Sequence, residues 1–192
     1  MHDSMVWIFV SSMVVNNFTL TLFLGLCSFL GVTGKVSTAI RLGAADTFVL
    51  LVTSVVVTFL NRFLLGHAPY LRIIAFIVVI ASVVQFLEML IRKVSPTLFR
   101  ELGIYLPLIT TNCAMLGLAI FQTNRGYTFL QGLVFAVGAG AGLTLALTLM
   151  ASIRERVELS DVPRMARSMG LVLIIASCLS LAFMGFAGLF SS

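Results

Sequence analysis

The sequence predicts an all-α integral membrane protein with six transmembrane helices, in a single membrane domain that covers residues 1–192. Hydrophobic residues make up 60% of the chain, charged residues only 10%, and the mean hydropathy is +1.13, whereas soluble domains carry about 25% charged residues. Because one crossing needs roughly 20 apolar residues, the chain has room for about six crossings and no soluble domain. The net charge of +5 is dispersed at the ends of the apolar segments, which argues against nucleic-acid binding.

The apolar segments follow one another with mostly short polar connections. They cover residues 5–32, 44–65, 71–91, 98–121, 128–153 and 168–190. The one long connection, residues 154–167, mixes acidic and basic residues and is predicted to be a solvated loop; docking of a cytoplasmic subunit is the alternative. Each half of the chain, about residues 1–93 and 94–192, contains three segments. Any duplication that relates the halves must therefore be inverted in the membrane, as in many transporters.

The basic residues predict the orientation of the chain. Nine of the 12 lie in the connections after the first, third and fifth segments: Lys35, Arg41, Arg92, Lys93, Arg100, Arg154, Arg156, Arg164 and Arg167. Loops rich in lysine and arginine remain on the cytoplasmic side of a membrane. We therefore expect both termini on the opposite side.

The first and fourth segments have the features of broken helices. In the first, Gly25 and Gly31 flank Cys27, and the segment is longer than a straight crossing needs. In the fourth, Pro107 forfeits a backbone donor, and three polar residues follow it: Thr110, Thr111 and Asn112. Their side chains can bond backbone groups that lipid leaves unsatisfied. Because the two segments occupy matching positions in the two halves, we expect half-helices rather than ordinary kinks.

A cysteine motif repeats in these two segments. The pattern C-x-x-L-G occurs at Cys27–Gly31 and again at Cys113–Gly117, whereas the third cysteine, Cys178, is expected to be a packing residue. Matched thiolates suggest a metal site near the middle of the bilayer. Two thiolates cannot complete a tetrahedral zinc site or a Cys₄ iron–sulfur cluster. The site is therefore either incomplete or completed by a second chain.

Other polar and small residues have structural interpretations. Glu88 precedes Arg92 by four positions, which predicts an interfacial ion pair, with a carboxylate in an ion pathway as the alternative. Asp46 lies near Arg41 at the start of the second segment and is expected to anchor it at the interface. A stripe of small residues in the fifth segment predicts close helix packing, and a subunit contact is expected there: Gly138, Gly140 and Gly142.

Several longer stretches resemble the family of the A-type membrane subunit of the bacterial Rnf electron-transport complex. They are VNNF at 15–18, FLGLCSFLG at 23–31, VQFLEMLIRK at 84–93, LGIYLPLITTNC at 102–113, IRER at 153–156 and LAFMGF at 181–186. The resemblance runs essentially from end to end. A sister family, the E-type subunit of the sodium-translocating NADH:quinone reductase, has the same plan, but the TTNC and NNF stretches are more similar to the Rnf member.

The resemblance implies a membrane subunit of a redox-driven ion pump of the ferredoxin:NAD oxidoreductase type. Such a subunit pairs with an oppositely oriented homologue, the E-type subunit of the Rnf complex, around an intramembrane [2Fe–2S] cluster, for which Cys27 and Cys113 match the family's ligands. Gly25, Ser28, Thr110, Thr111 and Asn112 would surround it. Flavin- and iron–sulfur-carrying subunits complete the translocase, which moves Na⁺ or H⁺ across the bacterial inner membrane. The resemblance assigns no catalytic residue and no independent activity to this subunit.

One position departs from the family pattern. The family usually has proline after the first cysteine, whereas this chain has Ser28, whose hydroxyl is able to donate a hydrogen bond to a cluster sulfur and raise the reduction potential. The rival class is a secondary transporter or ion channel subunit with an inverted repeat and no redox cofactor. Such a protein has no need of matched thiols at both breaks.

Overall fold

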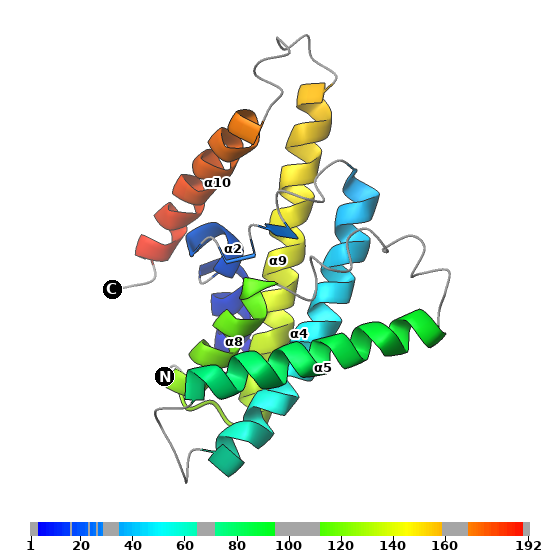
Figure 1. Cartoon of the computed structure of the whole chain (residues 1–192). Coiled ribbons are helices and arrows are strands. Elements are labelled where there is room, and N and C mark those ends of the chain that lie inside the picture. Colours follow the sequence, from blue (N-terminus) through cyan, green and yellow to red (C-terminus); the bar gives the residue numbers. More distant parts are fainter. Residues whose placement is uncertain are drawn as a thin grey trace.

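A computed structural model describes residues 4–15, 17–22, 24–25, 27–28, 35–64, 72–94, 112–158 and 169–189 of the chain. Every regular element in these ranges is a helix, which confirms the predicted all-α class (Figure 1). In chain order the elements are α1 (Met5–Val10), the π-helix η1 (Ser11–Val15), α2 (Phe18–Thr21), α4 (Val36–Leu64), α5 (Arg72–Val94), α8 (Cys113–Asn124), α9 (Phe129–Glu158) and α10 (Met169–Leu189).

Within the described ranges, three helices are long and apolar enough to cross a membrane. They cover Val36–Phe63, Ile73–Leu90 and Phe129–Val157. Three shorter apolar helices occupy Met5–Val14, Cys113–Asn124 and Gly170–Gly185. The long helices extend beyond the apolar segments of the sequence, since α4 begins eight residues before the expected Ala44 and α9 continues five residues beyond Ile153. Arg41 and Arg154, expected in connections, therefore belong to helices.

Helices α4 and α9 form the centre of the molecule, where they run side by side in opposite directions (Figure 1). A Cβ at Gly43 would lie 2.5 Å from Thr144 Oγ1, and a Cβ at Gly140 would lie 2.6 Å from Thr47 Oγ1. Each of these two glycines thus packs against a threonine of the opposite helix. In addition, each threonine hydroxyl donates a hydrogen bond to the carbonyl of the glycine four residues earlier in its own helix, at 2.7 Å for Thr47 and 2.8 Å for Thr144. The contact is reciprocal, as in a two-fold interface.

The N-terminal segment packs against a second face of α9. Gly138 directly contacts Ser12, and a Cβ at Gly142 would lie 2.8 Å from the Met13 carbonyl oxygen. Buried Asn17 donates from Nδ2 to the Gly142 carbonyl oxygen at 2.8 Å. The small-residue stripe of the fifth segment therefore serves close packing as predicted. Its three glycines face other helices of the same chain, and the subunit contact expected on this segment stays a prediction.

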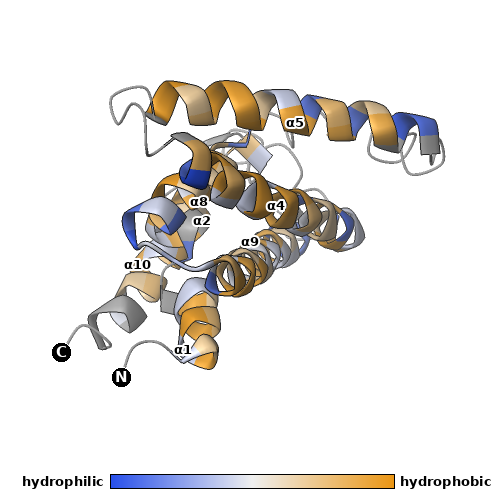
Figure 2. Cartoon of the chain, turned by 90° about the horizontal axis from the view of Figure 1, so that it is seen from below, coloured by the Kyte–Doolittle hydropathy of each residue, from blue (hydrophilic) through white to orange (hydrophobic). Residues whose placement is uncertain are grey.

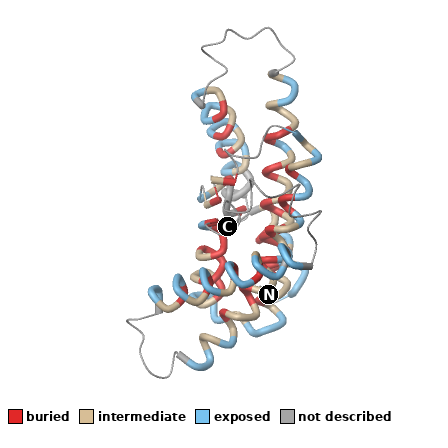
Figure 3. The backbone as a smooth tube through the Cα atoms, turned by 45° about the vertical axis from the view of Figure 1, so that its right-hand side comes forward, coloured by how far each residue is buried: buried red, intermediate tan, exposed pale blue. Residues whose placement is uncertain are grey.

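Helix α5 lies across α4 and α8, at the edge of the bundle (Figures 1 and 2). Large apolar side chains are exposed along it, and Figure 2 shows that hydrophobic residues predominate in most of the helices. The buried residues collect where α4, α8 and α9 meet (Figure 3). An apolar exterior around a packed interior is the pattern of a helical protein surrounded by lipid or by other membrane subunits.

Candidate functional site

The second cysteine of the repeated motif lies at the start of a helix. Asn112 is the N-cap of α8, with an extended backbone, and its Oδ1 accepts a hydrogen bond from the Ala114 amide at 3.1 Å. Cys113 is the first residue of the 12-residue helix. The unpaired amides at a helix start carry partial positive charge, which stabilises an anionic group nearby.

The residues around the first motif approach this helix start. Gly25 has φ +90°, a conformation that side chains disfavour, and a Cβ there would lie 3.1 Å from Asn112 Oδ1. A Cβ at Gly117 would lie 3.3 Å from Leu24 Cδ1. The chain just before Cys27 therefore packs on the first turns of α8. The structure brings together two predicted site residues, Gly25 and Asn112, that are 87 positions apart in the sequence.

The cysteines and their neighbours differ in exposure. Cys27 is half-buried and Cys113 is exposed, and both are free thiols. The Ser28 side chain is fully buried, and its hydroxyl has no hydrogen-bond partner in the described part of the chain. Thr110 and Thr111 lie outside the described residues. Cys178, expected to be a packing residue, is exposed on α10.

A pocket of about 290 Å³ opens beside Cys113, between α5 and α8. Its walls are mostly apolar: Ile77, Ile80, Ala81, Met115 and Leu116 join Asn112 and Cys113. Among the described residues, no three histidine, cysteine or acidic side chains gather into a metal-binding group. Cys113 lines this pocket and Cys27 does not, but Gly25, two residues before Cys27, packs on the start of α8. Two cysteine thiols would be half of the donor set of a Cys₄ iron–sulfur cluster. The pair thus fits a cluster whose remaining ligands come from a second chain.

The position of Asp46 differs from the expectation. It is 0% exposed and lies ten residues into α4, about 15 Å along the axis at 1.5 Å per residue, whereas Arg41 is exposed. The Asn112 side chain lies beside its carboxyl group, but the described residues give neither oxygen a well-formed hydrogen bond. The interfacial role was inferred from the start of the apolar run at Ala44, and α4 begins earlier, at Val36.

Glu88, the candidate ion-pathway residue, is half-buried on α5, and Arg92 is exposed one turn further along. It is not among the residues that line the pocket beside Cys113. The described contacts neither join it to the cysteines nor assign it a pathway.

The sequence interpretation missed a polar cluster between α4 and α8. Buried Gln122 accepts a hydrogen bond from Ser54 Oγ at 2.9 Å and donates to Thr58 Oγ1 at 2.9 Å. Next to it, Asn61 donates to Thr123 Oγ1 at 2.7 Å. A pocket of about 450 Å³, also lined by Arg62 and Tyr127, opens onto the cluster. The residues come from two helices more than 60 positions apart in the sequence, so only their hydrogen bonds identify the group.

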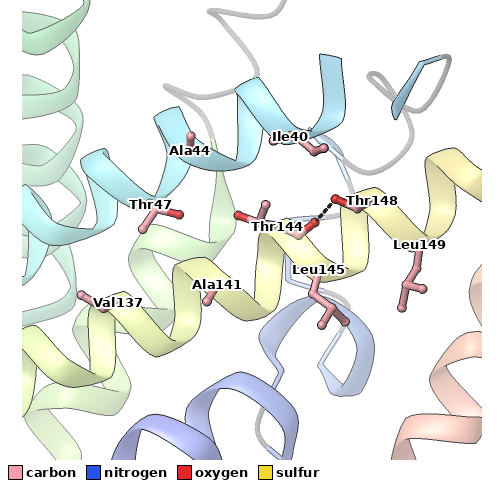
Figure 4. A pocket seen from close by; sticks show the side chains of 9 residues that line it. All are labelled: Ile40, Ala44, Thr47, Val137, Ala141, Thr144, Leu145, Thr148 and Leu149. Carbon is pink, nitrogen blue, oxygen red and sulfur yellow. Dashed lines mark hydrogen bonds between the residues drawn. The ribbon is translucent and has the colours of Figure 1, made fainter. Parts of the chain in front are cut away.

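A wider groove of about 690 Å³ runs along the junction of α4 and α9 (Figure 4). Three threonines line it among aliphatic side chains: Thr47, Thr144 and Thr148. Their hydroxyls already donate to carbonyl oxygens one turn earlier in the same helix. The groove surface is therefore largely apolar, and none of its lining residues is charged.

Comparison with known proteins gives matches over nearly the full chain. Residues 5–190 match the family described as "Rnf-Nqr subunit, membrane protein". Three relatives are named as the A-type subunit of an ion-translocating oxidoreductase complex: those of Syntrophotalea carbinolica, Serratia proteamaculans and Yersinia pseudotuberculosis, which are 54%, 53% and 52% identical to this chain. Each comparison covers 184 residues and 95% of both sequences.

Proposed function

Because the chain belongs to the Rnf-Nqr family of membrane subunits, we propose that it is the A-type subunit of an ion-translocating oxidoreductase complex. In this proposal it is a translocase subunit of the bacterial inner membrane, has both termini on the periplasmic side, and acts only within the assembled complex. With an oppositely oriented homologue, the E-type subunit, it holds an intramembrane [2Fe–2S] cluster. When bound, the cluster supplies a one-electron carrier within the bilayer.

The approach of Gly25 to the N-cap of α8 is the observation that carries this proposal. It joins the neighbourhoods of two cysteines that come from opposite halves of the chain. Cys27 and Cys113 would hold the iron. Asn112 fixes the backbone at Cys113 by capping the helix, and the helix start offsets the negative charge of thiolate ligands.

Ser28 is suited to a supporting role beside the cluster. Its hydroxyl is buried without a partner in the described residues, and an unsatisfied buried hydroxyl is costly. A hydrogen bond from this hydroxyl to a sulfur atom would remove that cost. Donors to sulfur also stabilise the reduced, more negative state of an iron–sulfur centre, so Ser28 would raise its potential.

The contact between α4 and α9 supports the inverted relation of the two halves. These helices correspond to the second apolar segment of each half of the sequence, and they run antiparallel. A two-fold rotation that exchanges α4 and α9 would carry the Gly43–Thr144 contact onto the Gly140–Thr47 contact. An axis of this kind in the membrane plane relates the halves of inverted-repeat membrane proteins. We therefore propose six spans as two inverted repeats, about residues 1–93 and 94–192.

The experiment that tests the proposal uses the purified whole complex. Iron, acid-labile sulfide and the electron paramagnetic resonance spectrum are measured for the wild type, Cys27→Ala and Cys113→Ala. We expect each variant to lose one [2Fe–2S] signal and about two iron atoms per complex. Cys178→Ala is the matched control, because this third cysteine is exposed on α10, and it should retain the full signal.

An unchanged iron and sulfide content in both variants would contradict the cluster assignment. The cysteines would then be packing residues, and the chain would be better described as a transporter or channel subunit without a redox cofactor. Loss of the signal in only one variant would place the second ligand elsewhere.

A further inference from the structure

We propose that the Asp46 carboxylate binds one monovalent cation, Na⁺ or H⁺, at the place where α4 meets the start of α8. The inference deepens the proposed function, because it places a cation site in this subunit, next to a proposed cluster ligand. The first observation behind it, the burial of Asp46, does not depend on whether a cluster is present.

The burial of Asp46 is complete, and the buried residues nearest to it along α4 are apolar. Its side chain is 0% exposed and lies on the buried stripe of α4, among Ala39, Leu42, Val49 and Leu50. Thr53, further along the same stripe, donates its hydroxyl to the Val49 carbonyl oxygen at 2.8 Å and so serves its own helix. A carboxylate in such a place, inside a membrane-spanning helix, is costly unless a positive charge reaches it.

Within the described residues, the helices packed on α4 do not supply that charge at this depth. Helix α8 contains no charged residue, and α9 has none from Phe129 to Ile153. The charged residues of α5 lie near its two ends: Arg72, Glu88, Arg92 and Lys93. On α4 itself, Arg41 and Arg62 are exposed. Neither Asp46 oxygen has a hydrogen-bond partner by ordinary geometry among the described residues.

One carboxylate carries a single negative charge, so one monovalent cation leaves the site neutral. A divalent cation would leave an excess positive charge in the same low-dielectric surroundings. Among the described residues, the Asn112 side chain lies beside the carboxyl group. Its Oδ1 accepts from the Ala114 amide, which leaves the NH₂ group to face the carboxylate as a neutral donor that adds no charge to the site. Na⁺ and H⁺ would both act in the same way at this site, as a small monovalent cation that neutralises the buried carboxylate.

Asn112 also links this site to the proposed cluster. It faces Asp46 with its side chain, caps α8, and directly precedes Cys113. Consecutive Cα atoms are only about 3.8 Å apart. A negative charge added near Cys113 would therefore strengthen cation binding at Asp46, and a bound cation would favour that added charge to the same extent.

The test is difference infrared spectroscopy of the purified complex, comparing buffers in which Na⁺ replaces choline at constant ionic strength. If Asp46 binds Na⁺, the wild type shows a carboxylate stretching band that shifts with Na⁺, and Asp46→Asn loses it. If Asp46 binds H⁺, the wild type shows a protonated-carboxyl band that shifts in D₂O, does not respond to Na⁺, and disappears in Asp46→Asn. Thr53→Val, a near-isosteric change on the same buried stripe, should retain either band.

Identical spectra of Asp46→Asn and the wild type in both buffers would overturn the proposal. A second measurement needs no variant: a hydrophobic carbodiimide is applied to the wild-type complex and the labelled peptide is found by mass spectrometry. A label on Asp46 that Na⁺ suppresses supports the Na⁺ site, a label that Na⁺ does not change supports the H⁺ site, and no label in either buffer contradicts both. Iron and sulfide content, measured in parallel, distinguishes failure of this inference from failure of the cluster assignment.

Discussion

The reciprocal glycine–threonine contact between α4 and α9 predicts that Gly140→Ala lowers the stability of the chain. By contrast, Gly185→Ala, which lies away from this contact on α10, should raise it. In Gly140→Ala, the new Cβ would lie 2.6 Å from both Thr47 Oγ1 and Thr47 Cγ2. Overpacking of a close contact costs about 1–3 kcal/mol, and the gain in helix propensity from glycine to alanine returns about 1 kcal/mol. The net destabilisation is therefore about 1 kcal/mol at the middle of the range, which corresponds to a Tm about 2–4 °C lower for a chain of this size.

Gly185→Ala is the matched control. Gly185 lies within helix α10, and a Cβ there would have no neighbour within 4 Å among the described residues. Only the propensity gain of about 1 kcal/mol applies, so its Tm should rise by about 2–4 °C. The assay heats solubilised membranes and follows the soluble fraction of the tagged chain by immunoblot.

A double mutant isolates the contact itself. Thr47→Gly removes the side chain that the new Cβ meets, so Gly140→Ala should cost little or nothing in that background. Gly43→Ala should behave like Gly140→Ala, because its Cβ would lie 2.5 Å from Thr144 Oγ1. If Gly140→Ala raised Tm as much as Gly185→Ala, the two helices would not be in such close contact and the reasoning would be refuted.

Three further changes test the site and the polar cluster. Gly25→Ala places a side chain at φ +90° and 3.1 Å from Asn112 Oδ1; strain of about 1–3 kcal/mol should lower the iron content of the purified complex, and full iron retention would argue against a tight junction. Ser28→Ala should leave iron content unchanged and lower the potential of the cluster in a redox titration, whereas an unchanged potential would exclude a hydrogen bond to sulfur. Gln122→Leu removes the acceptor of the buried Ser54 hydroxyl and the donor to Thr58 Oγ1. It should lower stability by about 1–3 kcal/mol, measured as a lower Tm.

Hydropathy located the long helices but not their ends. The apolar run that predicts the fifth span stops at Ile153, yet α9 continues through Arg154 and Arg156 to Glu158. Hydropathy reports which residues suit lipid, and a helix continues into water wherever its backbone hydrogen bonds persist. The same difference at the start of α4 moved Asp46 from the expected interface to the interior.

The cysteine motif was visible in the sequence, whereas the contacts around it were not. Asn112 was recognised as a polar residue beside Cys113, but its role as N-cap depends on where α8 begins. Its approach to Gly25 depends on how the two halves pack. Gln122 and Ser54 are 68 positions apart, and no local pattern connects them. Long-range side-chain pairs of this kind are decided by tertiary packing and not by periodicity.

The interlocked threonines of α4 and α9 also restrict how this subunit is able to move. Each threonine sits over a glycine of the opposite helix, and sliding one helix by a full turn, about 5.4 Å, would carry a threonine away from the only residue type that leaves room for it. The α4–α9 pair therefore resists sliding and moves as one rigid unit. We expect a conformational cycle of the subunit to move other elements relative to this rigid pair, above all the short helices α1, η1, α2 and α8.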